Sequence, residues 1–227
     1  MRILILGATG AAGGALFDRA LTDPRVSGVS VIVRDPSSLG GPAGNTKLRV
    51  HPLGDFAELQ RAATAFVAID VCFYCVGRAT SQVPDDAEYR RLALDWPLAA
   101  AALLRQHSPA AAFHYLSGQG AAARSAQRWA RVKYEAEVAL RAGFQAVCWR
   151  PGAIDAARQQ GWPWHYRLVI PVMRALLPLR SVYVRGPDLA CAMLAAAAAG
   201  VRDRVYENRQ IRALADRANA AGERAGP

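Results

Sequence analysis

The sequence predicts an α/β protein built on a doubly wound parallel sheet, and three observations predict it. Apolar runs of strand length alternate with stretches of helical spacing, a glycine-rich turn follows the first run directly, and the alternation continues to about residue 150 without a linker. Parallel neighbours need a crossover, which is right-handed in almost every such unit. We expect one domain over residues 1–212, with a small helical C-terminal insert at about 153–185 and a flexible tail at 213–227.

Six runs are expected to be the strands, because each is apolar or β-branched and ends in turn residues. In order they are Ile3–Leu6, Val29–Val33, Leu48–His51, Asp70–Val76, Ala111–Leu116 and Ala146–Trp149. Helical spacing, or a position directly after the glycine turn, predicts the helices. These are Ala15–Leu21, Pro84–Gln106, Ser125–Ala142 stopped by Gly143, and Pro187–Ala199.

The composition indicates a soluble, folded and basic protein. Of 227 residues, 52% are hydrophobic and 20% are charged, and the formal net charge is +10. The arginines are scattered and form no basic run interleaved with aromatics, so we expect a diffuse positive surface and no nucleic-acid partner. Only two of the cations, Lys47 and Lys133, are lysines. No apolar run is long enough to span a membrane, which favours a cytoplasmic location.

The four cysteines are expected to be core residues of a reducing compartment. Cys72 and Cys75 have CxxC spacing, but they fall in a predicted strand, where residues three apart point to opposite faces. His107, His114 and His165 form no constellation, and no group of His, Cys and Asp has metal-ligand spacing. We therefore predict no metal site.

The glycine turn between the first strand and the first helix predicts a dinucleotide site. A pyrophosphate must approach backbone N–H groups that a Cβ atom would obstruct, and the positive end of the helix dipole then faces the phosphates. A glycine at every third position suits this turn. The residues expected to hold the cofactor here are Gly7, Thr9, Gly10, Ala11, Ala12 and Gly13.

The end of the second strand bears on the choice of dinucleotide. An acidic side chain there bonds the ribose 2′-hydroxyl of NAD, whereas an arginine accommodates the 2′-phosphate of NADP. Arg34 holds this place, which favours NADP(H), but Asp35 follows it and leaves NAD(H) open. Arg34 could equally be an ordinary surface cation. Asp55, after the third strand, is expected near the adenine and can also cap a helix.

A series of short motifs in chain order supports a resemblance. It comprises the glycine turn, Arg34-Asp35-Pro36, Gly54-Asp55, Val76-Gly77, Tyr115-Leu116-Ser117, Val132-Lys133 and Arg150-Pro151-Gly152. The series resembles the atypical short-chain dehydrogenase/reductase superfamily, in particular its small NAD(P)-binding branch of TIP30-like and NmrA-like proteins. This resemblance implies a Rossmann-type fold with the insert on the substrate side.

The resemblance also implies roles for single residues. Val76 and Gly77 would border the cofactor, Ser117 would lie beside the nicotinamide, and Pro151 and Gly152 would precede the loop that closes over the carboxamide. A Tyr-x-x-x-Lys pair on one helical face would do the chemistry, with the lysine on the nicotinamide ribose and lowering the pKa of the phenol.

This chain has Trp129 four residues before Lys133, where the tyrosine is expected. An indole N–H can donate a hydrogen bond but cannot supply a proton at neutral pH. Tyr115, Tyr134 and Ser117 are the nearby substitutes, and each has a drawback: Tyr115 is deep, Tyr134 is about 100° around the helix, and Ser117 is a poor acid.

Two functions therefore stay open. One is an NADP(H)-dependent oxidoreductase on a small carbonyl or alcohol, with Ser117 and Lys133 as catalytic residues. The other is a non-catalytic NADP(H)-binding redox sensor or partner-binding protein. The aromatic cluster at 162–166 is expected either to wall the substrate pocket or to pack the insert.

Overall fold

The structure, a computed structural model, describes residues 1–40, 44–78, 82–83, 85–155 and 181–224. Within them, seven parallel strands form one sheet in the order β3-β2-β1-β4-β5-β6-β9. The strands are β1 (Arg2–Leu6), β2 (Gly28–Val33), β3 (Leu48–Pro52), β4 (Val71–Tyr74), β5 (Ala112–Leu116), β6 (Val147–Arg150) and β9 (Arg204–Glu207). The predicted fold class, an α/β doubly wound parallel sheet, is confirmed.

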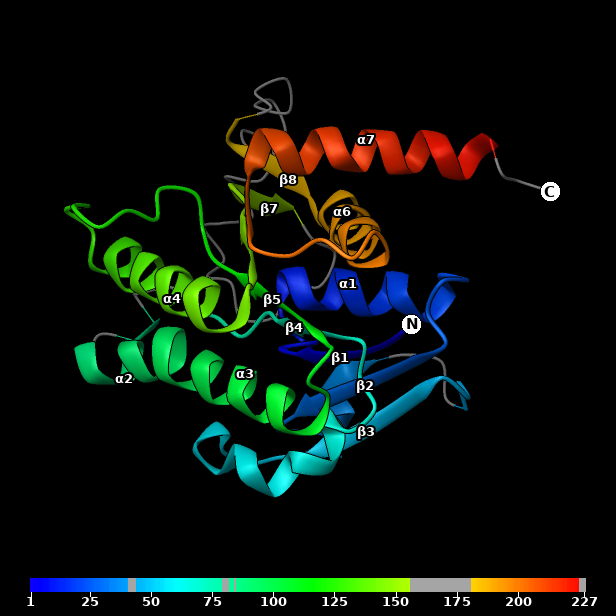
Figure 1. Cartoon of the computed structure of the whole chain (residues 1–227), viewed down its shortest axis with the longest axis horizontal. Helices are drawn as coiled ribbons and strands as arrows, with labels where there is room; N and C mark the ends of the chain where they lie inside the picture. The colour runs from blue at the N-terminus through cyan, green and yellow to red at the C-terminus, as the bar shows by residue number, and fades with distance from the viewer. Residues whose placement is uncertain (41–43, 79–81, 84, 156–180, 225–227) are drawn as a thin grey trace.

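Helices cover both faces of the sheet (Figure 1). One face carries α1 (Ala11–Thr22) and α6 (Gly186–Ala198), and α7 (Asn208–Arg224) packs on α6. The other face carries the 3₁₀ segment η2 (Phe56–Phe66), α2 (Asp86–Arg90), α3 (Trp96–His107) and α4 (Arg128–Phe144). Each face buries its own apolar cluster, and Cys72 and Cys75 fall in different clusters, as the alternation along a strand requires.

The strand order reverses between β1 and β4. β2 and β3 lie to one side of β1, whereas β4, β5 and β6 follow on the other. In open α/β sheets, ligands bind outside the carboxyl ends of the strands at this switch point. The residues that leave β1 and β4, which begin at Gly7 and Cys75, are therefore the first place to look for a site.

A π-helical turn, η4 (Arg91–Asp95), joins α2 to α3. Such a turn releases carbonyl groups from the regular helical ladder, and two buried tyrosines of the sheet satisfy them. The Tyr74 hydroxyl donates to the Leu92 carbonyl at 2.9 Å, and the Tyr115 hydroxyl donates to the Ala93 carbonyl at 2.6 Å. The sheet thereby fixes the helix that borders its carboxyl edge.

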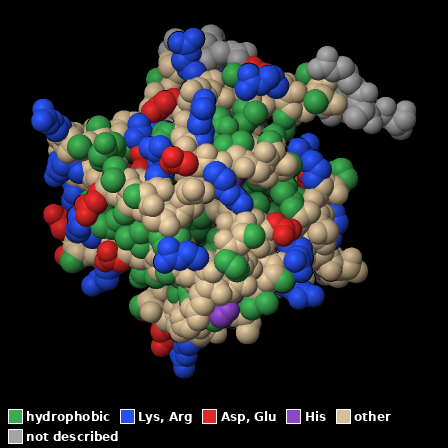
Figure 2. Space-filling model, viewed as in Figure 1, with side chains coloured by type: hydrophobic (Ala, Val, Ile, Leu, Met, Phe, Trp, Pro, Cys, Tyr) green, Lys and Arg blue, Asp and Glu red, His purple; other side chains and the backbone are tan. Residues whose placement is uncertain are grey.

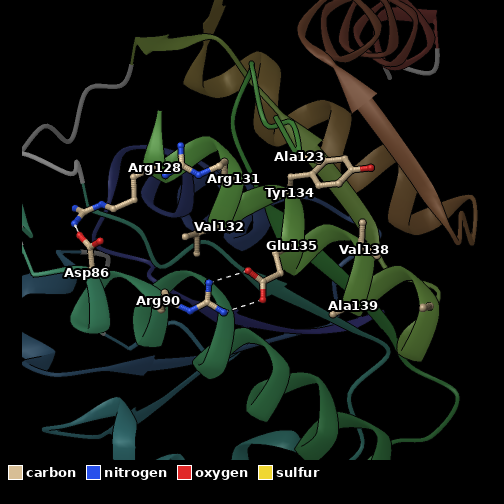
Figure 3. A pocket seen from close by; sticks show the side chains of 11 residues that line it. Asp86, Arg90, Ala123, Arg128, Arg131, Val132, Tyr134, Glu135, Val138 and Ala139 are labelled. Carbon is tan, nitrogen blue, oxygen red and sulfur yellow. Dashed lines mark hydrogen bonds and ion pairs between the residues drawn. The ribbon is translucent and has the colours of Figure 1, made fainter. Parts of the chain in front are cut away.

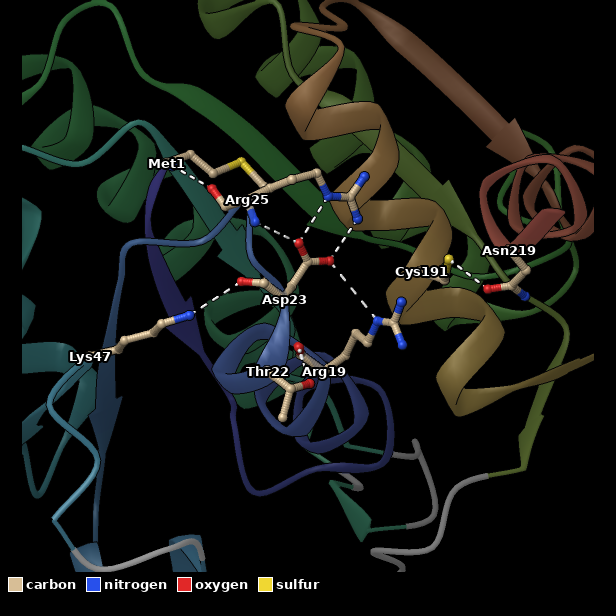
Figure 4. A network of polar contacts seen from close by, with 8 residues as sticks. All are labelled: Met1, Arg19, Thr22, Asp23, Arg25, Lys47, Cys191 and Asn219. Atoms are coloured by element: carbon tan, nitrogen blue, oxygen red, sulfur yellow. Dashed lines mark hydrogen bonds and ion pairs between the residues drawn. The ribbon is translucent and has the colours of Figure 1, made fainter. Parts of the chain in front are cut away.

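A buried carboxylate organises the amino edge of the sheet (Figure 4). Asp23 accepts hydrogen bonds from the guanidinium of Arg25 at 2.9 and 2.6 Å, and this pairing lowers the pKa of Asp23. The Lys47 ammonium donates to the Asp23 carbonyl at 3.3 Å. Of the two lysines of the chain, Lys47 thus supports the edge of the sheet opposite to the switch point.

The C-terminal third differs from the sequence prediction. Residues 213–224, expected to be a flexible tail, continue α7, because Ile211 and Ala215 bury one side of this helix in the core beside α6. At the two ends of the insert that was expected to be helical, β7 (Ala153–Asp155) and β8 (Tyr183–Arg185) pair as a small parallel sheet. The span between them, 156–180, contains the aromatic cluster and lies outside the described residues.

Smaller differences concern boundaries. The strand expected at 70–76 is β4 at 71–74, and β9 was not predicted. The helix expected to stop at Gly143 runs to Phe144, and Gln145 takes the left-handed conformation, with φ 50°, that closes it. Its backbone N–H caps the helix by donating to the Arg141 carbonyl at 3.0 Å.

Candidate functional site

A cleft of about 400 Å³ lies at the switch point, over the carboxyl ends of β1, β2 and β4. Residues from the first βα turn, the end of β2, the start of η2 and the segment after β4 line it. Seven of the residues predicted to hold a cofactor are among them: Gly7, Thr9, Gly10, Arg34, Asp55, Val76 and Gly77. The structure therefore gathers into one cleft the residues that sequence reasoning collected from four separate segments.

The three glycines of the first turn serve different purposes. A Cβ on Gly13 would lie 2.1 Å from the Gly7 carbonyl oxygen, and a Cβ on Gly7 would lie 2.7 Å from the carbonyl carbon of Cys75. Both positions need glycine because backbones meet there. A Cβ on Gly10 would meet nothing closer than 3.5 Å, and Gly10 faces the cleft. The space beside Gly10 is therefore open to a ligand.

The start of α1 suits an anion. Gly10 is the N-cap residue, and it has no side chain to occupy the free N–H groups of the first turn. The first turn also carries no acidic residue. The positive end of the helix dipole and these N–H groups point to the place where a phosphate would lie. Ala11 and Ala12 belong to this turn but do not line the cleft.

At the end of β2, the two charged candidates, Arg34 and Asp35, make different contacts. The Asp35 carboxylate caps the short helix η1 (Pro36–Leu39), where it accepts hydrogen bonds from the backbone N–H of Ser37 at 2.9 Å and from its hydroxyl at 2.8 Å. Asp35 does not line the cleft, whereas Arg34 does. The side chain of Arg34 is exposed and forms no ion pair with any described residue.

The far wall of the cleft is apolar. Phe56 stacks on Trp96 with 5.7 Å between ring centroids, and Leu92 lies beside them. Leu92 belongs to the π-turn that the two tyrosines hold, so the sheet positions this wall. Asp55 caps η2 by accepting a hydrogen bond from Ala57 N–H at 2.8 Å, which confirms its predicted capping role, and it also lines the cleft.

Beyond the cleft, the carboxyl end of β5 carries the second group of predicted residues. Lys133 of α4 is only 8% exposed, and its Nζ donates to the Leu116 carbonyl at 2.7 Å and lies 4.9 Å from the centroid of the Tyr115 ring. Burial lowers the pKa of Lys133 to about 8. Glu137, one helical turn further on, opposes this shift.

Ser117 directly follows Leu116, whose carbonyl accepts the hydrogen bond from Lys133. It is 7% exposed, and its Oγ has no hydrogen-bond partner among the described residues. A buried hydroxyl without a partner costs free energy, about 1–3 kcal/mol. Such an atom at the end of a central strand suits a ligand oxygen.

Trp129 covers the loop that leaves β5. A Cβ on Gly118 would lie 3.1 Å from Cζ3 of the Trp129 ring, and a Cβ on Gly120 would lie 3.7 Å from its Cη2. The indole N–H donates to the Gln127 side chain. Tyr134, one position along α4 from Lys133, lines a groove between α2 and α4 on a different side of the helix (Figure 3). Tyr134 therefore does not join Ser117 and Lys133.

Gly152 has a structural explanation that sequence reasoning missed. A Cβ there would lie 2.2 Å from the Val182 carbonyl oxygen, and the Gly152 N–H donates to Asn208 Oδ1 at 2.8 Å. Asn208, buried at the start of α7, also donates to the Tyr183 carbonyl at 2.9 Å. Pro151 is buried, and its carbonyl accepts from the Gln119 N–H at 3.0 Å. Neither Pro151 nor Gly152 lines the cleft.

Other polar groups do not add to the site. His114 is fully buried, its Nδ1 accepts from Trp149 Nε1 at 3.3 Å, and burial lowers its pKa to about 3.

Among the described residues, no three His, Cys, Asp or Glu side chains gather as a metal would require. Within the same part of the chain, no helix has both the length and the apolar character to cross a membrane. Lys and Arg side chains are spread over the face in Figure 2.

Comparison with known proteins finds similarity in structure alone. No protein-family model matches the sequence, and no curated protein sequence matches it. WbmF of Bordetella bronchiseptica, solved with NAD⁺, superposes with a TM-score of 0.68 at 18% identity, covering 100% of this chain and 79% of that one. UDP-glucose 4-epimerase of Thermotoga maritima, solved with UDP-glucose, superposes with a TM-score of 0.65 at 17% identity, covering 100% and 84%.

A third structure, UDP-N-acetylglucosamine 4-epimerase of Methanobrevibacter ruminantium, gives a TM-score of 0.68 at 12% identity, covering 90% of this chain and 74% of that one. At such identities the likeness establishes the fold. It does not single out the TIP30-like and NmrA-like branch. The chain has the Rossmann fold that it shares with WbmF and these epimerases.

Proposed function

We propose that this protein binds NADP(H) in the cleft at the switch point. The observation that carries the proposal is the open space beside Gly10 at the N-terminus of α1, with Arg34 lining the same cleft. The N–H groups of the helix would hold the pyrophosphate. Arg34 would hold the 2′-phosphate, and Asp35, occupied by Ser37, would not compete for a 2′-hydroxyl.

The rest of the site fits the remaining half of such a cofactor. Lys133 has two N–H donors besides the one on Leu116, enough for the two hydroxyls of a ribose. Ser117 offers an unpartnered hydroxyl to a ligand oxygen. Val76 and Gly77 line the cleft and would border the cofactor between its adenosine and nicotinamide halves. We propose that Pro151 and Gly152 border the nicotinamide. A bound nicotinamide would supply or accept a hydride.

For the reaction, we propose an oxidoreductase that acts on a small carbonyl or alcohol. Ser117 would orient the substrate oxygen by donating a hydrogen bond to it. Lys133 would hold the ribose and place positive charge near the reacting oxygen. Since Trp129 cannot donate a proton, the proton would come from solvent, and turnover would be slow.

A second function has one specific observation in its favour. The Trp129 ring packs on Gly118, directly after Ser117, and so occupies the neighbourhood in which a general acid would be expected. A protein that binds NADP(H) and does no chemistry could use the same cleft as a redox sensor or as a module that binds a partner protein.

One experiment separates these functions. The purified protein is titrated with NADPH and with NADH by fluorescence. Wild type, Trp129→Tyr and Trp129→Phe are then screened for NADPH oxidation with small aldehydes and ketones, and for NADP⁺ reduction with small alcohols and with UDP-glucose, which is included because a structural relative was solved with it. Slow turnover by wild type supports the oxidoreductase. Binding without any turnover by wild type supports the sensor, and binding of neither nucleotide contradicts both.

A further inference from the structure

Lys133 lies one helical turn from a series of ion pairs that begins at the buried Glu137 and ends at the exposed Glu207. Glu137, on the same face of α4, is 2% exposed. Arg150 of β6 holds its carboxylate, with Nε donating to Oε1 at 2.9 Å and Nη2 donating to Oε2. Arg150 Nη1 in turn donates to Glu207 of β9 at 2.8 Å. These ion pairs thus join α4, β6 and β9.

Glu137 is expected to favour the charged form of Lys133. Among the groups near this ammonium that bear on its pKa, Glu137 is the one that is negatively charged. From the sheet, Cys75 after β4, Tyr115 of β5 and Cys148 of β6 surround Lys133. Burial raises the pKa of the Cys75 thiol to about 12 and that of the Cys148 thiol further still, so both are neutral near pH 7. Burial likewise raises the pKa of the Tyr115 phenol well above its ordinary value.

A charged lysine away from water needs such a partner. The cost of burying an unpaired ammonium is large, and a buried lysine gives up its proton instead. An uncharged Lys133 would keep two N–H donors, one of them on the Leu116 carbonyl, and could not donate to both hydroxyls of a ribose. Because Arg150 donates hydrogen bonds to both carboxylate oxygens, Glu137 cannot turn away from the core easily.

We infer that Glu137 is a positioning residue: clamped by Arg150, its carboxylate keeps the Lys133 ammonium charged and directed at the carboxyl end of β5. The role rests on the proposed function, because it serves the lysine that would hold the cofactor ribose. Glu137 touches neither substrate nor cofactor, and it acts through Lys133.

The two lysines of the chain allow a direct test. The protein is labelled with ¹³C-lysine, and the two side-chain resonances are followed by NMR from pH 5.5 to 11, with Lys47→Arg to assign them. In wild type, the Lys133 midpoint is expected near 8. In Glu137→Gln it is expected to fall by about one unit, since removal of a nearby opposite charge shifts the pKa of a buried group by about that much.

Two matched variants control for the loss of a negative charge and for a change at Arg150, which binds Glu137. Glu135→Gln removes one negative charge from the same helix, but Glu135 is exposed and pairs with Arg90 at 2.8 Å (Figure 3), so the Lys133 midpoint should stay at its wild-type value. Glu207→Gln removes the other carboxylate that Arg150 binds but leaves Glu137 in place, so the Lys133 midpoint should again stay at its wild-type value. Glu137→Asp, which keeps the charge, should restore most of the shift and carries the test if Glu137→Gln does not fold.

An unchanged Lys133 midpoint in a folded Glu137→Gln protein overturns the inference. A shift of the same size in Glu135→Gln overturns it too, because the effect would then be one of net charge. The affinity for NADPH gives the functional arm: above the Lys133 midpoint binding should weaken, and in Glu137→Gln this loss should begin about one unit lower.

The failure of this inference and the failure of the proposed function can be told apart. If wild type binds neither NADPH nor NADH, the proposed function is wrong, while the NMR titration still decides whether Glu137 controls Lys133. If the nucleotides bind and the midpoint does not move, the cofactor proposal stands and the role of Glu137 is wrong.

Discussion

Trp129 lies directly against Gly118, the residue after Ser117, where a methyl group would already be tight: a Cβ there would lie 3.1 Å from Cζ3 of the indole. The side chain four residues before Lys133 therefore reaches the carboxyl end of β5. A phenol at position 129 would extend toward the same loop. In the function proposed above, this is the position of the general acid, and tryptophan cannot fill that role.

The first prediction concerns this position. Trp129→Tyr should raise the rate of NADPH-dependent carbonyl reduction by about 10²–10⁴-fold over wild type, because it restores a general acid beside Ser117. Trp129→Phe removes the same bulk and restores no acid, so it should not raise the rate. The rates are compared at saturating NADPH, with circular dichroism to confirm that each variant is folded. Equal rates in the Tyr and Phe variants would count against a proton donor at this position.

The glycine turn gives a pair of opposite expectations. Gly13→Ala should lower the free energy of unfolding by about 3 kcal/mol or more, since its Cβ would overlap the Gly7 carbonyl oxygen. Gly10→Ala should fold normally, because its nearest neighbour is 3.5 Å away, yet lower NADPH affinity at least about tenfold by obstructing the helix N-terminus.

Urea unfolding and NADPH titration separate the two effects. Gly28→Ala, which has comparable space and lies outside the cleft, is the control that should change neither quantity strongly. Gly10→Ala protein that is folded and binds NADPH as tightly as wild type would remove the main support for the proposed cofactor position.

Much of the site could be predicted from the sequence, because glycines and strand ends carry local signals. Gly7, Gly10 and Gly13 follow a strand and open a helix, and parallel topology then brings the ends of β2 and β4 beside them. The capping role of Asp55 is local as well. The cap at Asp35 was missed although its signal is local too, since an aspartate followed by proline is typical of a helix start.

Of the C-terminal elements, the helix expected at Pro187–Ala199 is present as α6, whereas β9, α7 and the pairing of β7 with β8 were missed because their signals are largely tertiary. β9 has four residues and gains its stability by pairing with β6. Asn208 is buried only because β8 and Gly152 offer partners for its amide. For α7 a signal did exist: Ile211 and Ala215 are four residues apart, which is helical spacing, but the polar residues around them suggested a frayed end.

The choice between dinucleotides gives the next prediction. Arg34→Ala should weaken NADPH binding about 10- to 100-fold, the loss of one charge-assisted contact of about 1.5–3 kcal/mol, and should leave NADH binding nearly unchanged. Asp35→Ala should alter neither affinity by more than about twofold, because its carboxylate bonds Ser37. Calorimetric titration of both nucleotides into the three proteins measures this. An Asp35→Ala protein that loses NADH specifically would reverse the assignment.

His114 predicts how stability depends on pH. Its pKa is about 3 when folded, against about 6.5 in an unfolded chain, so the unfolded state binds more protons in acid. The stabilisation due to neutral His114 is complete above pH 6.5 and is lost as the pH falls toward 3, by up to about 1.4 kcal/mol per pH unit.

His114→Gln keeps an acceptor for the Trp149 N–H and has no titrating group. Its free energy of unfolding should therefore change less between pH 6.5 and 4 than that of wild type, as urea unfolding at a series of pH values would show. His51→Gln, at an edge strand where burial lowers the pKa less strongly, should reduce the slope by a smaller amount. Parallel curves for wild type and His114→Gln would contradict the assignment.

The central claim is that the cleft holds NADP(H), and the measurement that tests it most directly is titration of the wild-type protein with NADPH and NADH at one salt concentration. The account predicts saturable binding of both nucleotides, NADPH the tighter by at least about tenfold through the 2′-phosphate on Arg34. Equal affinities would contradict the role of Arg34, and binding of neither nucleotide would contradict the account as a whole.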